Sequence, residues 1–141
     1  MSFEAKFRRK LEGALMPHVS LMSYMSSMSK SGIPDEHLIH DGRAYWLELK
    51  AVEKWPKKNA SNVLKHRFTA PQLAFMRRTD EAKGRGFGVI GWNDGLWRCI
   101  AVRVHRIADD GSISKEEIDK HAVLTLDPWF HARFLNLIHR S

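Results

Sequence analysis

The sequence predicts an α/β fold of the mixed α+β kind, in which helices flank a central mixed sheet. Three observations carry this prediction: an apolar stripe at helical spacing near the start, two strand pairs joined by glycine-containing turns, and a capped helix between them. The resulting order is helix, hairpin, helix, hairpin, helix, which is typical of helices packed on one sheet. With 141 residues and no linker-like segment, the chain is expected to form a single domain over residues 1–141.

The first helix is expected over residues 3–15, where apolar side chains recur every four residues. The stripe consists of Phe3, Phe7, Leu11 and Leu15. The following Ser/Met-rich segment, 20–30, fits neither helical nor strand spacing well. We interpret it as a loop or an irregular strand, with the methionines at 22, 25 and 28 supplying adaptable packing.

Two hairpins are predicted from turn residues between β-forming runs. Residues 36–40 and 43–52 flank Asp41-Gly42, and residues 86–92 and 96–104 flank the segment 93–95, Asn-Asp-Gly. Between the hairpins, Thr69, Pro71 and Gly84 have the properties of a cap, a first-turn residue and a stop for a helix over 69–83.

A last helix is expected over residues 128–139, and it could equally close the core or form a dimer face. Of the five tryptophans, we expect Trp92, Trp97 and Trp129 in the core. Trp46 could line a substrate cleft or pack beneath the first helix.

Composition excludes several classes of protein. The chain is 43% hydrophobic with a mean hydropathy of −0.40, and it has no apolar run long enough to span a membrane. Its single cysteine, Cys99, cannot form an internal disulfide or a multi-cysteine zinc site. The N-terminal segment alternates charged and apolar residues, unlike a secretory signal. We therefore expect an intracellular protein.

The charge balance favours a polyanionic partner. Lys and Arg number 23 against 16 Asp and Glu, which gives a formal net charge of +7. Between Lys54 and Thr79 there is no acidic residue. This basic segment is either a solvated loop leading into a helix or a phosphate-binding surface. Its candidate DNA contacts are Lys57, Lys58, Lys65, Arg67, Arg77 and Arg78, with Trp55 as a candidate for base stacking.

Three residues have the spacing of a hydrolytic metal site. Side chains alternate along a strand, so Glu48 and Lys50 project from one face and Leu47 and Leu49 from the other. We expect the charged face to lie in a cleft or on open surface. The hairpin can bring Asp35, just after the Pro34 turn, beside Glu48. Paired carboxylates repel, and a divalent cation relieves the repulsion; Mg²⁺ commonly takes one or two protein carboxylates.

This pattern, Pro34-Asp35 followed by Glu48-Leu49-Lys50, resembles the PD-(D/E)XK nuclease superfamily. The segments 31–35 (Ser-Gly-Ile-Pro-Asp) and 46–51 (Trp-Leu-Glu-Leu-Lys-Ala), followed by a helix with Gln72, are similar to phage-type Holliday junction resolvases, including the endonuclease I type, and to virus-type replication-repair nuclease (VRR-NUC) domains. The resemblance covers roughly residues 3–92. It implies a restriction-endonuclease-like core around the central sheet.

The resemblance also implies roles for individual residues. Asp35, Glu48 and the Leu49 carbonyl would hold Mg²⁺, with Mn²⁺ as a substitute, and Lys50 would act on the attacking water. These families place a glutamate on the first helix, for which Glu4 is the first candidate and Glu12 the second. Gln72 would position a metal water or a phosphate.

Simpler interpretations stand beside these roles. Gln72 and Thr69 fit a capping box, and Glu4 could pair with Arg8 one turn later. Many relatives also carry an Arg-Ile-Glu-like segment before the Pro-Asp turn, whereas residues 20–29 here contain no acid.

The function implied is a structure-selective DNA endonuclease that cuts branched DNA as a homodimer, in a bacterial or phage-infected cell. The alternatives are a nicking, single-strand or restriction-type nuclease, or a basic DNA-binding protein whose site is inactive. A membrane-surface role, based on the four basic residues of the first helix, is a distant third.

Overall fold

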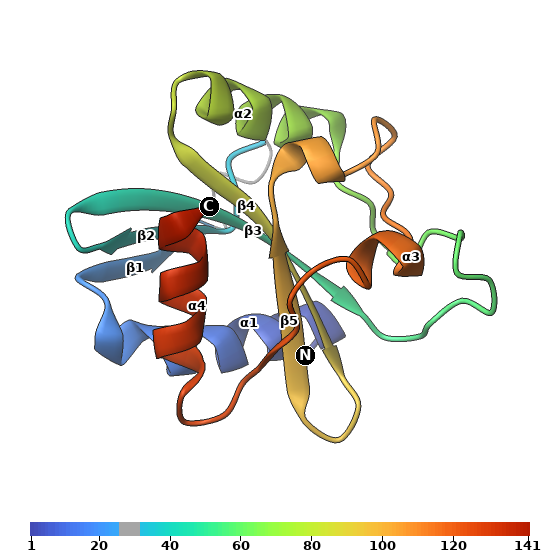
Figure 1. The fold of residues 1–141 in the computed structure, drawn as a ribbon, viewed down its shortest axis with the longest axis horizontal. Helices are drawn as coiled ribbons and strands as arrows, with labels where there is room; N and C mark the ends of the chain where they lie inside the picture. The colour runs from blue at the N-terminus through green and yellow to red at the C-terminus, as the bar shows by residue number, and fades with distance from the viewer. Residues whose placement is uncertain (26–31) are drawn as a thin grey trace.

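The computed structural model describes residues 1–25 and 32–141, which form a six-stranded sheet with helices on both faces (Figure 1). The strands are β1 Leu21–Tyr24, β2 Glu36–His40, β3 Arg43–Val52, β4 Arg85–Asn93, β5 Trp97–Val102 and β6 Leu124–Thr125. The helices are α1 Phe3–Leu15, α2 Ala70–Glu81, α3 Lys115–Ile118 and α4 Phe130–Arg140. This arrangement confirms the predicted α/β fold with its central mixed sheet. In the described ranges, no helix has both the length and the apolar character that crossing a membrane requires.

The strands follow one another across the sheet in chain order. Every neighbouring pair is antiparallel except β3 and β4, which run parallel and are connected through α2. The β2–β3 hairpin closes where predicted, because Asp41 and Gly42 both adopt the positive φ angles of a tight hairpin turn. The sequence predicted both hairpins, but the parallel pairing between them depends on tertiary packing.

One face of the sheet is covered by α1 and α4. The predicted stripe of α1 packs there through Phe7, Leu11 and Leu15, all fully buried. They meet Tyr45, Leu47 and Leu49 of β3, and α4 adds Phe130, Phe134, Leu135 and Ile138. The last helix therefore closes the core, which is one of the two roles predicted for it.

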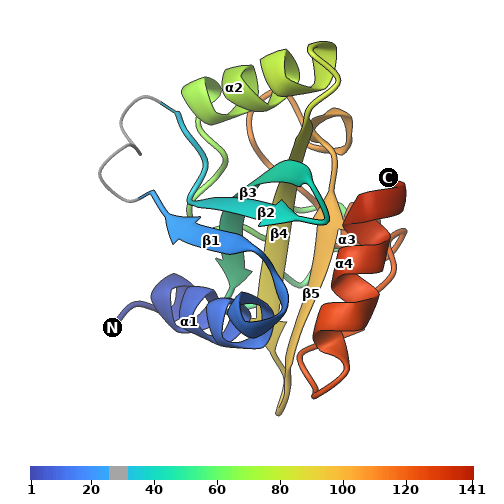
Figure 2. The same cartoon turned by 90° about the vertical axis from the view of Figure 1, so that its left-hand side faces the viewer.

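The opposite face is covered by α2, a 3₁₀ turn at Val104–Arg106, α3 and the segment 61–68. Figure 2 shows α2 at the top of the view, apart from α1 and α4. Val63, Leu64 and Phe68 are buried in this second core. The basic segment is therefore not a purely solvated loop, because its apolar residues anchor it to the sheet.

Two sequence expectations about single segments need correction or refinement. Trp129 was expected in the core but is 69% exposed at the start of α4, whereas Trp92 is buried and Trp97 packs against Phe7. The Ser/Met-rich segment contributes β1, with Met22 buried against the first core. Met28 lies outside the described residues.

Candidate active site

Asp35 lies where β2 begins, and the strand register places it opposite Glu48. The first pair of the β2–β3 ladder is Glu36 with Leu47, so one further antiparallel step aligns Asp35 with Glu48. The Asp35 carboxylate (Oδ2) accepts a hydrogen bond from the Leu49 N–H at 2.9 Å. The Asp35 carboxylate thus accepts the hydrogen bond of a β3 backbone N–H just outside the β2–β3 ladder, where no β2 backbone group pairs with it.

Glu48 projects from the α2 face and is only 2% exposed. Its Oε1 atom has no hydrogen-bond partner, which is costly for a buried carboxylate. Burial, together with the nearby charge and carboxyl of Asp35, raises the pKa of Glu48 to about 10, and Lys50 opposes the shift. A buried acid, Glu48, therefore lies beside the half-buried Asp35 without a hydrogen-bond partner at its Oε1 atom.

Lys50 places a cation beside Glu48. Its Nζ donates to the Arg67 carbonyl at 3.2 Å and lies 4.0 Å from Glu48 Oε2. The Phe68 ring covers the ammonium, with its centroid 5.3 Å away. The expectation that this charged face lies in a cleft or on open surface was wrong for these two side chains, because the segment before α2 folds over them and leaves Lys50 5% exposed.

Glu4, the first candidate for the helix glutamate, lies at the same site. Burial raises the pKa of Glu4; the Lys50 charge opposes this shift and the Asp35 charge adds to it. The Glu4 carboxyl therefore lies within electrostatic reach of both side chains. Glu4, Asp35 and Leu49 line a small cavity of about 100 Å³. Arg8, the other possible partner of Glu4, instead forms its ion pair with Glu12 at 3.3 Å.

Glu36 is a buried acid that the sequence reasoning missed. It is fully buried on the α1 face, and neither of its carboxyl oxygens has a hydrogen-bond partner. Burial, together with the neighbouring Glu12 carboxyl, raises the pKa of Glu36 to about 9. The available signal was an acid at an inward position of β2, in phase with the buried Leu38.

Gln72 adopts the capping geometry. Its side-chain Oε1 accepts a hydrogen bond from the Thr69 backbone N–H at 2.8 Å, and its backbone N–H donates to Thr69 Oγ1 at 3.2 Å. The cap occupies the amide oxygen and leaves the side-chain NH₂ for any further contact. Trp46 packs edge-on against Phe75 of α2. It therefore lies on the α2 side of the sheet, and the prediction that it packs beneath α1 was wrong.

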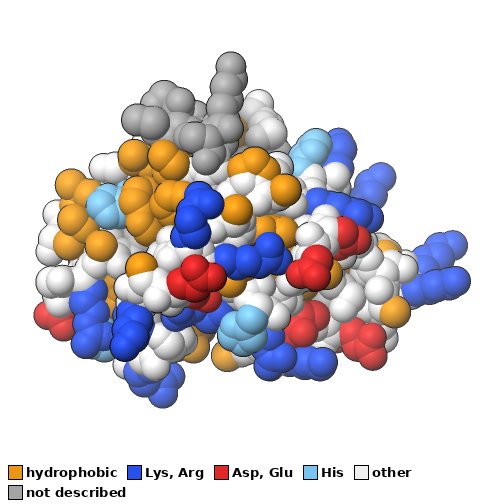
Figure 3. Space-filling model, turned by 90° about the horizontal axis from the view of Figure 1, so that it is seen from above, with side chains coloured by type: hydrophobic (Ala, Val, Ile, Leu, Met, Phe, Trp, Pro, Cys, Tyr) orange, Lys and Arg blue, Asp and Glu red, His pale blue; other side chains and the backbone are white. Residues whose placement is uncertain are grey.

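The candidate DNA contacts are exposed on the basic segment and α2. Arg67 pairs with Asp110 and Arg77 with Asp109, while Trp55 packs edge-on against Trp92. Seen from the α2 side, Figure 3 shows basic side chains spread over the surface with acidic ones among them. The remaining candidates are Lys57, Lys58, Lys65 and Arg78.

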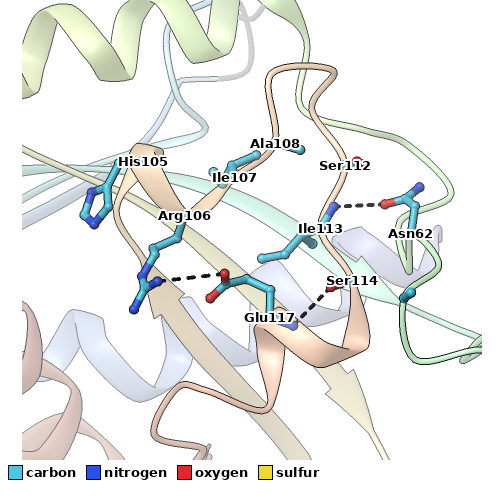
Figure 4. A pocket seen from close by; sticks show the side chains of 10 residues that line it. Asn62, His105, Arg106, Ile107, Ala108, Ser112, Ile113, Ser114 and Glu117 are labelled. Atoms are coloured by element: carbon cyan, nitrogen blue, oxygen red, sulfur yellow. Dashed lines mark hydrogen bonds and ion pairs between the residues drawn. The ribbon is translucent and has the colours of Figure 1, made fainter.

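A separate pocket of about 390 Å³ lies between the 3₁₀ turn, α3 and the segment around Asn62 (Figure 4). Its lining includes a single acid, Glu117, which is paired with Arg106 at 3.9 Å and with His121 at 2.8 Å. Without a second carboxylate, this pocket does not reproduce the paired acids found at Asp35 and Glu48.

The residues around Asp35 are of the chemical kind that a divalent cation takes as ligands. Within 1–25 and 32–141, no three His, Cys, Asp or Glu side chains converge in a geometry that would hold a metal. Mg²⁺ needs fewer, because it keeps several waters and takes one or two carboxylates. Asp35, the orphaned oxygen of Glu48 and the Leu49 carbonyl are oxygen donors of that kind.

Comparisons with known proteins support the fold. No protein-family model matches the chain, and no curated protein matches its sequence. Among solved structures, it is similar to Hjc of Archaeoglobus fulgidus, a Holliday junction resolvase from an archaeal hyperthermophile. The TM-score is 0.59 at 10% sequence identity, over 86% of this chain and 91% of that chain. The chain therefore has a resolvase-like fold.

Proposed function

We propose that the protein is a divalent-metal-dependent endodeoxyribonuclease that acts on branched DNA. The observation that carries the proposal is the pairing of Asp35 with Glu48 next to the Lys50 ammonium. This arrangement has no evident stabilising purpose, because burying the Glu48 carboxyl beside a second acid disfavours folding. Such arrangements are common where a site is built for a charged ligand.

In this proposal, Asp35, Glu48 and the Leu49 carbonyl hold Mg²⁺, and Mn²⁺ can take its place. When bound, the ion supplies Lewis-acid stabilisation to the phosphodiester under attack. The Leu49 N–H fixes the Asp35 carboxylate, so that one oxygen is committed to the backbone and the other is available. Glu4 adds a third carboxylate from α1 at the edge of the site.

Lys50 is the proposed group that handles the attacking water. Its ammonium has three N–H donors, and one is committed to the Arg67 carbonyl. The others can orient a water and offset negative charge as it develops on the phosphate. Because Phe68 and Arg67 hold the side chain in place, this donor set is positioned before substrate arrives.

Branched DNA is proposed from the resolvase-like fold together with the basic surface. Lys57, Lys58, Lys65 and Arg78 would contact phosphates, which position DNA without reading its sequence. Arg67, Arg77 and Trp55 can join them by exchanging their present partners. Two coordinated cuts in a branch need two sites, so we propose that a homodimer is the active form.

The test compares four DNA forms of related sequence: a four-way junction, a linear duplex, a single strand and a supercoiled plasmid. Each is incubated with the protein in Mg²⁺ or in EDTA, and products are resolved on denaturing gels. We expect Mg²⁺-dependent cutting that is fastest on the junction. Absence of metal-dependent cutting on all four forms would reject the enzyme proposal and leave a DNA-binding protein with an inactive site.

A further inference from the structure

Asp35, at the edge of the proposed site, lines the first of three neighbouring hollows. The cavity lined by Glu4 and Asp35 shares Ser2 and Glu4 with a second hollow of about 260 Å³. That hollow shares Glu53 and Lys65 with a third, of about 550 Å³. The shared lining residues place the three hollows in a row from Asp35, past the end of β3, to the segment 62–65; this row is called the groove below.

The groove is charged in a way that suits a nucleic-acid strand. Lys54 and Lys65 are exposed along it, and in the described part of the chain neither has an acidic partner within 4 Å. Unpaired lysines along a groove are well placed to contact backbone phosphates. His66 lines the middle hollow and provides a further polar contact.

The third hollow combines apolar, acidic and cationic lining. Val63 and Leu64, each 5% exposed, form an apolar part of its lining, and Glu53 adds a hydrogen-bond acceptor. Its volume lies within the roughly 300–1,000 Å³ typical of small-ligand pockets. Cationic groups along a groove are one part of the sites that hold single-stranded nucleic acid. Here the aliphatic Val63 and Leu64, rather than an aromatic ring, offer the apolar surface for a base.

We propose that this third hollow, the Val63–Lys65 pocket, captures an unpaired nucleotide of the DNA strand that is cut, at a position away from the phosphate under attack. A base inside a duplex is stacked and paired, so it reaches a pocket only when it is already unpaired or is extruded. The protein therefore selects branched DNA by its unpaired nucleotides. The inference rests on the proposed endonuclease function, and it makes branched DNA whose pairs open at the branch point a better substrate than a fully paired duplex.

The test uses a pocket-filling variant, Glu53→Trp, at an exposed position. The control, Glu81→Trp, makes the same chemical change at the last residue of α2. At 1.5 Å per residue, this position lies about 17 Å along the helix from its first residue, Ala70, which is the end nearer in the chain to the pocket. For each protein, kcat/KM in Mg²⁺ is measured on a flapped duplex, a four-way junction and a fully paired duplex. Affinity for the same three DNAs is measured in EDTA by fluorescence anisotropy.

We expect the unmodified protein and Glu81→Trp to prefer the flap over the paired duplex by at least tenfold, and Glu53→Trp to lose most of that ratio. Lys65→Ala should weaken binding to all three DNAs. The inference is overturned if the unmodified protein has equal kcat/KM on the flap and the paired duplex. It is also overturned if Glu53→Trp keeps the flap-to-duplex ratio of the unmodified protein. If no DNA is cut at all, the endonuclease proposal fails, and the anisotropy ratios still decide the pocket.

Discussion

The Asp35 carboxylate accepts a hydrogen bond from the Leu49 N–H at 2.9 Å, just beyond the last backbone pair between β2 and β3. This contact holds Asp35 beside Glu48 and fixes the peptide that follows it. A short hairpin can therefore position two acids that repel each other. The site and the core that supports it lead to five expected outcomes.

Replacing either acid by its amide should abolish cutting without unfolding the protein. In Asp35→Asn and Glu48→Gln the shape is kept but the charge that binds the cation is lost. We expect Mg²⁺-dependent cleavage to fall by at least about 100-fold. Single-turnover cleavage gives the rate, and circular dichroism checks the fold. The exposed Glu81→Gln serves as control; near-normal cleavage by Glu48→Gln would contradict the assignment.

Lys50→Met should lower kcat while leaving DNA affinity largely intact. Methionine keeps most of the buried volume but removes the ammonium beside Glu48. We expect a fall in kcat of about 100-fold or more, since a positioned donor is lost. Rates and anisotropy measured in parallel separate the two effects. A loss confined to affinity would make Lys50 a DNA contact instead.

Mg²⁺ should stabilise the protein through Glu48. At a free concentration of 100 times Kd, a ligand that binds only the folded state adds about 2.7 kcal/mol to the free energy of unfolding. Because the pKa of Glu48 without metal is raised to about 10, binding must release a proton. The affinity, measured by calorimetry between pH 6 and 8, should therefore tighten as pH rises. Glu48→Gln should show neither effect.

Glu36 should make the metal-free protein less stable as pH rises. Its folded pKa of about 9 exceeds the ordinary value of 4.5, so the folded state retains a proton that the unfolded chain releases. The stabilising contribution is complete below pH 4.5 and is lost progressively up to about pH 9. Glu36→Gln should therefore raise Tm at pH 8 but not at pH 4. Equal Tm differences at both values would show that its carboxyl does not titrate in this way.

The contact between α1 and β4 should be intolerant of added volume. A Cβ at Gly91 would lie within 2.3–2.5 Å of the Phe7 ring, whereas a Cβ at Gly13 meets nothing within 4 Å. Gly91→Ala should cost about 1–3 kcal/mol through overpacking. Gly13→Ala, in the same helix as Phe7, should instead stabilise by about 0.5–1 kcal/mol. Urea unfolding gives the change in the free energy of unfolding for both variants. If α1 were loosely packed on β4, Gly91→Ala would not lower this free energy.

Features that depend on neighbouring residues were predictable. The helical stripe of α1, the Asp41-Gly42 turn and the Thr69 cap are local signals, and each lies where the sequence places it. The turn also sets the β2–β3 register, which is why the spacing of Asp35 and Glu48 along the chain is itself informative. In these places, short-range preferences of the chain specify both the element and the face that it presents.

Contacts between distant segments set the remaining features. The parallel β3–β4 pairing, the cover that Phe68 and Arg67 place over Lys50, and the position of Glu4 rather than Glu12 beside Asp35 all bring together residues far apart in the chain. The burial of Glu36 and the exposure of Trp129 have the same origin. A strand pattern shows which side chains share a face, but only packing determines what covers that face and how far water is excluded from its charges.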